Sequence, residues 1–237
     1  MESPAASQPR QRWQILFART EPALRLRQAD VLADFVRVFD EAGLPLSRSA
    51  AAKPKPRLKL AANLPIGIEL RGEVLEAWFD RLITVDEMRQ ATDSLAAGLT
   101  VEDAREVWHG FPSAASQLRA AEYEMEVTTG EGVDADAIRA AIVRLLSAET
   151  LVGLRRRGES ERRTDAGIRD LRPYVEDVEL MGVDPPNGKA TLRMVLRLDA
   201  TGGGRPEDIV RALEVDVRGR RAVRTRLIFV DTPPIAR

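Results

Sequence analysis

The chain has 237 residues, enough for one large domain or two small ones, and its 44% hydrophobic content is ordinary for a protein that buries a core. Its 36 basic and 37 acidic residues leave a net charge of −1, so any attraction to nucleic acid or anionic membranes must come from local patches. The absence of cysteine excludes disulfides, thiolate metal sites, iron–sulfur clusters and a cysteine nucleophile within these residues.

The start of the chain and its hydropathy determine where we expect the protein to act. Residues 1–11 are polar and contain two prolines, so we expect a disordered lead-in rather than a signal peptide. No stretch approaches 18 consecutive apolar residues, so no membrane span is expected, and the cytoplasm is the expected location.

Residues 12–109 carry the pattern of a ferredoxin-like unit. Alternating or apolar runs predict strands at residues 13–19, 58–70, 74–81 and 99–108. Apolar residues at helical spacing predict a helix at 29–42. A capping box from Thr84 to Glu87 predicts a second helix that runs to about residue 97. The resulting order is β-α-β-β-α-β.

Residues 110–120 contain Gly, Pro and several Ser and are the expected linker, after which residues 121–232 repeat the order less clearly. Strands are predicted at 123–128, 151–156, 175–181, 190–198 and 223–230. Helices are predicted to begin after the N-cap Asp134 and at Pro206. The predicted fold is therefore α+β, with two tandem ferredoxin-like (βαββαβ) units, the second less regular.

Residues that could carry chemistry are sparse. His109 is the single histidine, which cannot form a His-rich metal site or a catalytic triad alone, and its place beside Gly and Pro favours a solvated boundary residue. Gly202–Gly204 precede a short helix and could cradle a phosphate, but no Walker or dinucleotide pattern is present, and a hairpin loop explains them as well. We therefore predict no catalytic residue, no metal site and no cofactor.

Three basic stretches are the candidates for binding an anionic partner. The first, stiffened by two prolines, contains Arg48, Lys53, Lys55, Arg57 and Lys59. The second contains Arg155, Arg156, Arg157, Arg162 and Arg163, followed by Arg169 and Arg172. The third contains Arg218, Arg220, Arg221, Arg224 and Arg226. Such clusters suit phosphates or carboxylates, and the alternative is that they are solvated charges that protect sheet edges from aggregation.

Several segments occur in an order that is typical of one bacterial family. They are Trp13–Thr20, Ala42-Gly43-Leu44-Pro45, the loop Ala51–Arg57, Leu64–Glu69 and Arg169–Tyr174. Together they resemble the radical SAM-linked proteins, a family of unknown function with a DUF2344-type domain. Asp30, Pro54, Pro56 and Arg57 match the family pattern. The chain departs from it where Arg27-Gln28 replace a Ser-His pair and Ala52-Lys53 replace Phe-Asn.

The resemblance implies a partnership with a radical SAM enzyme, which often carries a B12-binding segment. Because such an enzyme needs three cysteines for its cluster, the resemblance implies a non-catalytic accessory or substrate-presenting role for this chain. The candidate anion-binding or partner-binding residues are Asp30, Lys53, Lys55, Arg57, Arg155, Arg156, Arg157, Arg163 and Arg172. The alternative is an RNA-binding module that uses the basic loops, and an enzyme acting through carboxylates or arginines alone ranks last.

Overall fold

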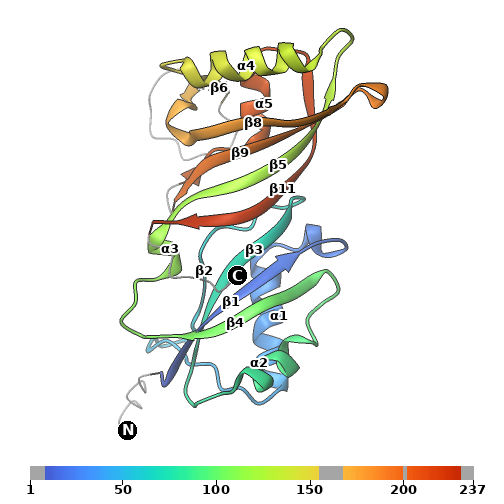
Figure 1. Cartoon of the computed structure of the whole chain (residues 1–237). Helices are drawn as coiled ribbons and strands as arrows, with labels where there is room; N and C mark the ends of the chain where they lie inside the picture. Colours follow the sequence, from blue (N-terminus) through green and yellow to red (C-terminus); the bar gives the residue numbers. More distant parts are fainter. Residues whose placement is uncertain (1–8, 155–167, 200–201, 231–237) are drawn as a thin grey trace. The chain divides into compact units, whose positions relative to one another are not determined.

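The computed structural model describes residues 9–154, 168–199 and 202–230, and these residues form mixed α and β structure (Figure 1). The chain divides into two compact units, of which the first comprises Met1–Leu118 with Phe229–Arg237 and the second Arg119–Ile228. The predicted α+β class is confirmed. The finer arrangement, two tandem ferredoxin-like units, stays a prediction.

The first unit is built on a sheet with the strand order β4-β1-β3-β2, in which neighbouring strands are antiparallel. The strands are β1 (Gln11–Arg19), β2 (Leu58–Leu60), β3 (Glu69–Phe79) and β4 (Leu99–Val107). The helices are α1 (Gln28–Glu41), α2 (Val85–Thr92) and α3 (Ala114–Gln117), with a 3-10 turn at Ala23–Arg25.

The core of this unit lies on one face of the sheet. Alternation along β1 places Trp13, Ile15 and Phe17 on the buried face, as the sequence predicted. They join a cluster with the apolar residues of α1 and α2, and the rings of Phe17 and Phe35 meet edge to face at 5.3 Å. Both helices therefore cover the same face, and Figure 1 shows α1 behind the sheet. We call the opposite side of the β4-β1-β3-β2 sheet the open face.

The structure corrects several predicted boundaries in the first unit. The predicted strand 58–70 stops at Leu60, because the chain turns at Pro65 and Gly67, where φ is 79°. The guanidinium of Arg19 donates to the carbonyl oxygens of Pro65 and Ile68 in this turning segment, and to that of Leu26 before α1. The Thr84 capping box is confirmed, but α2 ends at Thr92 rather than near residue 97. Gln11, assigned to the lead-in, belongs to β1, and residues 1–8 lie outside the described residues.

The second unit has the strand order β8-β9-β5-β11, with the short β10 also paired to β9. The strands are β5 (Leu118–Thr129), β8 (Val175–Asp184), β9 (Lys189–Asp199), β10 (Gly202–Gly203) and β11 (Val217–Phe229). The helices are α4 (Ala135–Ser147) and α5 (Pro206–Ala212), with 3-10 turns at Arg172–Tyr174 and Pro185–Asn187. Asp134 caps α4 as predicted, because its carboxylate accepts from the backbone N–H of Ala137 at 2.8 Å.

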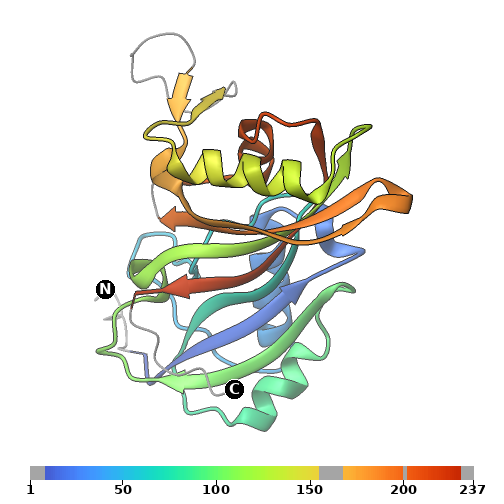
Figure 2. The same ribbon diagram turned by 45° about the horizontal axis from the view of Figure 1, so that its top comes forward.

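The second unit departs from the predicted six-element order. The predicted strand 151–156 is not part of the main sheet. Instead β6 (Val152–Leu154) pairs with β7 (Ile168–Asp170) as a separate ribbon, which Figure 2 shows clear of the main sheet. The predicted linker 110–120 contains α3 and the first residues of β5, and the division between the two units, after Leu118, falls within it. Gly202 and Gly203 form β10, which favours the hairpin interpretation of these glycines.

Candidate functional site

The register of the open face brings together polar residues that are far apart in the sequence. Gln14 on β1 lies opposite Glu76 on β3 and Arg105 on β4. Arg105 donates to the side-chain oxygen of Gln14 at 3.0 Å, and the amide of Gln14 donates to Glu76 at 3.2 Å. Because residues directly opposite on neighbouring strands share a face, this hydrogen-bonded row lies on the side of the sheet opposite α1 and α2.

A buried ion pair lies on the open face. Arg12 is 3% exposed, Glu76 is fully buried, and the two side chains are in direct contact. Arg12 also donates to the carbonyl oxygens of Phe111 at 2.6 Å and Pro112 at 3.0 Å. Glu76 accepts from the backbone N–H of Ala114 at 3.1 Å. The ion pair therefore fixes the segment after β4 against the open face.

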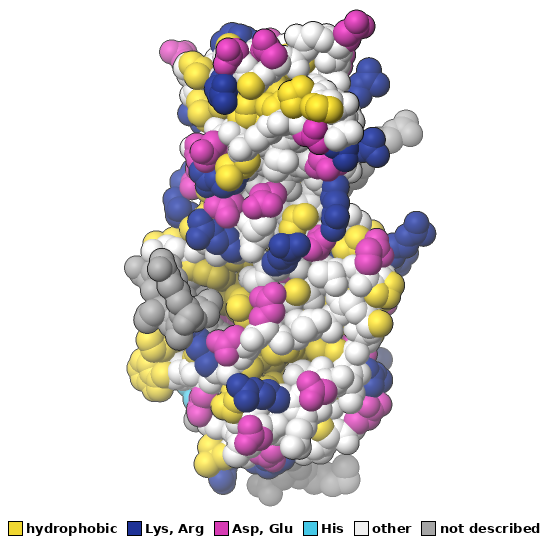
Figure 3. All heavy atoms as spheres, turned by 45° about the vertical axis from the view of Figure 1, so that its right-hand side comes forward, with side chains coloured by type: hydrophobic (Ala, Val, Ile, Leu, Met, Phe, Trp, Pro, Cys, Tyr) yellow, Lys and Arg dark blue, Asp and Glu magenta, His cyan; other side chains and the backbone are white. Residues whose placement is uncertain are grey.

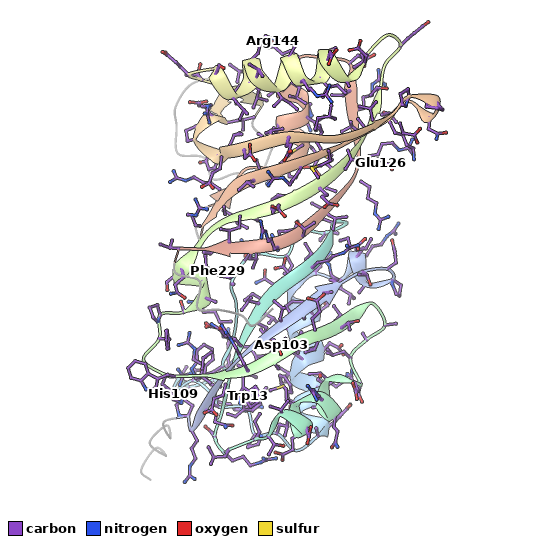
Figure 4. All side chains as sticks on the ribbon, viewed as in Figure 1. Trp13, Asp103, His109, Glu126, Arg144 and Phe229 are labelled. Carbon is purple, nitrogen blue, oxygen red and sulfur yellow. The ribbon has the colours of Figure 1, made fainter. Side chains whose placement is uncertain are left out.

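Two aromatic rings are exposed in the segment after β4, which the Arg12–Glu76 pair holds in place. We call Trp108-His109-Gly110-Phe111-Pro112 the aromatic turn. The side chain of Trp108 is 72% exposed and that of Phe111 is 49% exposed, and their rings meet edge to face at 6.1 Å. Figure 4 shows His109 in this turn after β4, where it is exposed, as the sequence predicted.

A small cavity of about 200 Å³ lies beside the aromatic turn. It is lined by Gln14, Arg105, Glu106, Val107, Trp108, Phe111, Pro112 and Gln117. The side-chain amide of Gln117 makes no hydrogen bond within the described residues, although its backbone carbonyl accepts from Val230. The cavity thus combines apolar walls with an amide that is available to a ligand.

The first basic stretch lies at the edge of the same sheet. We call Arg48, Lys53, Lys55, Arg57 and Lys59 the basic edge, and all five side chains are exposed. A backbone bridge between Arg48 and Pro56 closes its loop. Lys59 lies on β2, which pairs with β3 so that Lys59 is opposite Glu76. Among the described residues, no carboxylate forms a salt bridge with any member of the basic edge.

Trp78 connects the basic edge to the aromatic turn. The guanidinium of Arg57 lies 5.2 Å from the Trp78 ring, and that of Arg12 lies 5.4 Å from the same ring. Arg12 in turn binds the backbone of the aromatic turn. Lys59 also donates to the hydroxyl of Ser113, the residue that follows the aromatic turn, at 3.2 Å. The basic edge, Trp78 and the aromatic turn therefore form one continuous surface within the first unit.

Charged residues in the second unit are arranged differently. Arg193 on β9 contacts Glu122, Asp177 and Glu179 at 2.7–3.1 Å. Arg226, from the third basic stretch, also contacts Glu122 at 3.0 Å. Burial alone would raise the pKa of Glu122, but the hydrogen bonds from Arg226 and Arg193 lower it overall. These cross-strand pairs stabilise the sheet and leave little net charge for a partner.

The remaining predicted site residues have structural contacts or lie outside the described residues. Asp30 accepts from the backbone N–H of Arg27 at 2.9 Å and caps α1. Arg172 donates to the carbonyl oxygens of Leu146, Ala148 and Val175, two of which end α4. These contacts favour structural roles for both residues. The predicted residues outside the described ranges are Arg155, Arg156, Arg157 and Arg163.

The described residues were compared with the patterns of a metal site and of a membrane-spanning helix. Within them, no group of three or more His, Asp or Glu side chains is arranged to hold a metal ion. No described helix combines the length and the apolar character needed to cross a bilayer. On the face drawn in Figure 3, the described basic and acidic side chains are interspersed, in agreement with the balanced net charge.

The aromatic turn was missed in the sequence. The sequence pattern predicts a strand that ends at Trp108 and a linker that contains Phe111, and it marks neither residue for binding. A signal was nevertheless present, because two large aromatic residues occur within a Gly/Pro segment that follows a strand and has no helical or strand period. Large apolar residues outside any amphipathic pattern are candidates for an exposed binding surface.

The comparisons with known proteins identify the family. A family described as an uncharacterized protein conserved in bacteria (DUF2344) matches residues 12–206. The chain belongs to the DUF2344 family. No curated protein matches this DUF2344 chain.

Solved structures show similarity in fold to the DUF2344 chain. One is in a Cbf5-Nop10-Gar1 complex, with 10% identity, a TM-score of 0.52, and coverage of 91% of this chain and 48% of that chain. Another is in an archaeal box H/ACA sRNP Nop10-Cbf5 complex, with 14% identity, a TM-score of 0.47, and coverage of 91% and 47%. The DUF2344 chain thus spans about half the length of these chains. At such low identity, the first similarity shows a shared fold alone.

Proposed function

We propose that this protein binds single-stranded RNA through the open face of its first unit. The observation that carries the proposal is the basic edge, where five exposed cations lie together without a carboxylate in a salt bridge among the described residues. Unpaired cations on an extended edge suit a phosphate backbone, whose binding is driven by release of counterions. The open face beside them offers Trp78 and the aromatic turn as further contacts.

Lysine usage supports an anionic polymer over a protein at this edge. Of the 36 basic residues of the chain only four are lysines, and three of these are Lys53, Lys55 and Lys59. Lysine is depleted at protein–protein interfaces, whereas it contacts phosphates readily as a flexible point charge. The concentration of lysine at one edge is therefore better explained by phosphate contacts.

The test measures the affinity of the full chain for a labelled single-stranded RNA by fluorescence anisotropy between 50 and 200 mM salt. The variant Lys53→Ala/Lys55→Ala/Arg57→Ala should bind about tenfold more weakly or worse. It should also reduce the slope of log affinity against log salt by about 2, because each neutralised phosphate contributes about 0.7 for a single strand.

A matched control separates this effect from the loss of net charge. Arg139, Arg144 and Arg211 are exposed on helices of the second unit, and their replacement by alanine removes the same charge. The control should retain most of the affinity. Absence of RNA binding by the native chain, or an equal loss in both triple variants, would overturn the proposal.

A second proposal is that the protein serves a radical SAM enzyme as a non-catalytic accessory or substrate-presenting partner. Its support is the ordered set of motifs shared with the radical SAM-linked proteins, such as Ala42-Gly43-Leu44-Pro45, together with the DUF2344 match. With no cysteine in the chain, the cluster ligands must come from outside these 237 residues. Mixing with the purified radical SAM protein encoded nearby should give a complex at micromolar concentrations. Two separate peaks in size-exclusion chromatography would contradict it.

A further inference from the structure

The two aromatic rings of the aromatic turn are exposed and do not contribute to the core of the first unit. Trp108 and Phe111 are the exposed aromatic residues of this segment, at 72% and 49%. Neither ring belongs to the core cluster of the unit, so burial in the core does not account for them. Exposed rings of this size commonly mark a surface that another molecule covers.

The rings are held in place before any ligand arrives. Arg12 binds the carbonyl oxygens of Phe111 and Pro112, and the Arg12–Glu76 pair is itself buried. A Cβ atom on Gly110 would lie 2.3 Å from the Trp108 ring, so the ring packs against the backbone at a glycine. A fixed ring loses little conformational entropy on binding, which favours a stacking role.

The cavity beside the rings has the size and lining for one flat ring system. Its volume of about 200 Å³ is below the roughly 300–1,000 Å³ of pockets for drug-sized ligands. Trp108 and Phe111 supply apolar walls, and the free amide of Gln117 can both donate to and accept from the edge of a base. Lys59, bonded to Ser113, places a cation of the basic edge next to the turn.

We propose that the aromatic turn and this cavity form a subsite that stacks one unpaired base of a single-stranded RNA, while the basic edge contacts its phosphates. This inference rests on the RNA-binding function proposed above. Stacking on aromatic side chains and hydrogen bonds to an exposed base edge are the usual means of recognising single-stranded RNA. Gln117 then selects among bases, and Trp108 and Phe111 supply the stacking surface.

The first experiment compares a natural single-stranded RNA with an oligomer of the same length and charge that carries abasic positions. The native chain should prefer the natural RNA by about 5- to 150-fold, the factor that corresponds to one stacked base. Trp108→Ala should abolish most of that preference and leave the salt slope unchanged, whereas Trp108→Phe should retain part of it. Gly110→Ala, which displaces the ring without removing it, should behave like Trp108→Ala.

The emission of Trp108 gives a second readout. Trp13 is buried and Trp78 is half-buried, so Trp108 is the exposed indole, and a stacked base should quench it. Natural RNA should quench the native chain more than the abasic oligomer does, and Trp108→Phe should remove that difference. Circular dichroism of each variant checks that the fold is intact.

The outcomes separate this inference from the proposed function. RNA binding that depends on Lys53, Lys55 and Arg57 but not on Trp108 would overturn the stacking subsite and leave the function standing. Equal affinity of the native chain for natural and abasic oligomers would do the same. If Trp108→Ala instead weakens only a complex with the radical SAM protein, the turn is a protein-docking surface and the inference is wrong. Absence of any RNA binding would overturn both.

Discussion

The charged residues of the two units are arranged in different ways. In the second unit, Arg193 and Arg226 are paired across strands with Glu122 and its neighbours. In the first unit, the cations of the basic edge have no salt-bridge partner among the described residues, and the buried pair Arg12–Glu76 holds a turn with two exposed rings. In the second unit, acidic side chains of the sheet neutralise these arginines, whereas the first unit retains unneutralised cations and exposed aromatic rings.

This difference shows that the number of arginines in a stretch does not identify a binding site. The third basic stretch has as many cations as the first, yet its Arg226 is bound to Glu122 in the sheet. What distinguishes the basic edge is that, among the described residues, no salt bridge joins its cations to a carboxylate, and that the guanidinium of Arg57 lies over the Trp78 ring. The accompanying carboxylates, rather than the cations, decide which stretch can attract an anion.

The largest expected effect follows from breaking the buried pair of the first unit. Arg12→Leu leaves the carboxylate of Glu76 buried without its partner, which should lower the free energy of unfolding by about 3–5 kcal/mol. The three tryptophans, Trp13, Trp78 and Trp108, all lie in the first unit, so their emission in a urea titration follows the unfolding of that unit. Adding Glu76→Leu should restore much of the loss, and a double variant as unstable as the sum of the two single variants would contradict this account.

A smaller effect is expected from the network of the second unit. Glu122→Ala removes the shared partner of Arg193 and Arg226, but those arginines stay partly exposed, and Arg193 keeps Asp177 and Glu179. The free energy of unfolding should fall by about 1 kcal/mol or less, the range for ion pairs near the surface. Amide hydrogen exchange of β5 and β9 measures it, and a loss as large as that of Arg12→Leu would remove the contrast between the two faces.

The smallest expected effect is a dependence of the second unit on pH. Because the pKa of Glu122 is lowered in the folded state, its carboxylate stabilises the unit above the unfolded value of about 4.3 and this contribution disappears as the pH falls through the folded value. The pKa of Asp170 is also lowered, by hydrogen bonds from the backbone of Leu151 and Arg172, and acts in the same direction. Hydrogen exchange should therefore become faster in the second unit between pH 6 and pH 3. The variant Glu122→Gln should show a smaller dependence on pH.

The sequence was sufficient where local patterns decide the structure. The alternation of Trp13, Ile15 and Phe17, the helical stripe of α1 and the Thr84 and Asp134 caps were all predicted, because each depends on neighbours within a few residues. The predicted strand through Pro65 was wrong, because a proline and a glycine with positive φ end the pairing there.

The candidate site could be predicted only in part. The basic edge is contiguous in sequence and was recognised. The contacts of Arg12 with Glu76 and with Phe111 span 64 and 99 residues, so they depend on strand register, which a single sequence does not specify. The same dependence concealed the link from Arg57 through Trp78 to the aromatic turn.

The contacts of Arg12 have a consequence for local opening. One guanidinium joins strand β1, strand β3 and the turn at residues 108–112, so the turn cannot detach without exposing a buried charge in the middle of the sheet. Detachment of the turn should therefore be a rare sub-global event rather than loop fraying. A molecule that covers the turn would suppress that event, and its arrival would be detected as slower amide exchange on β1.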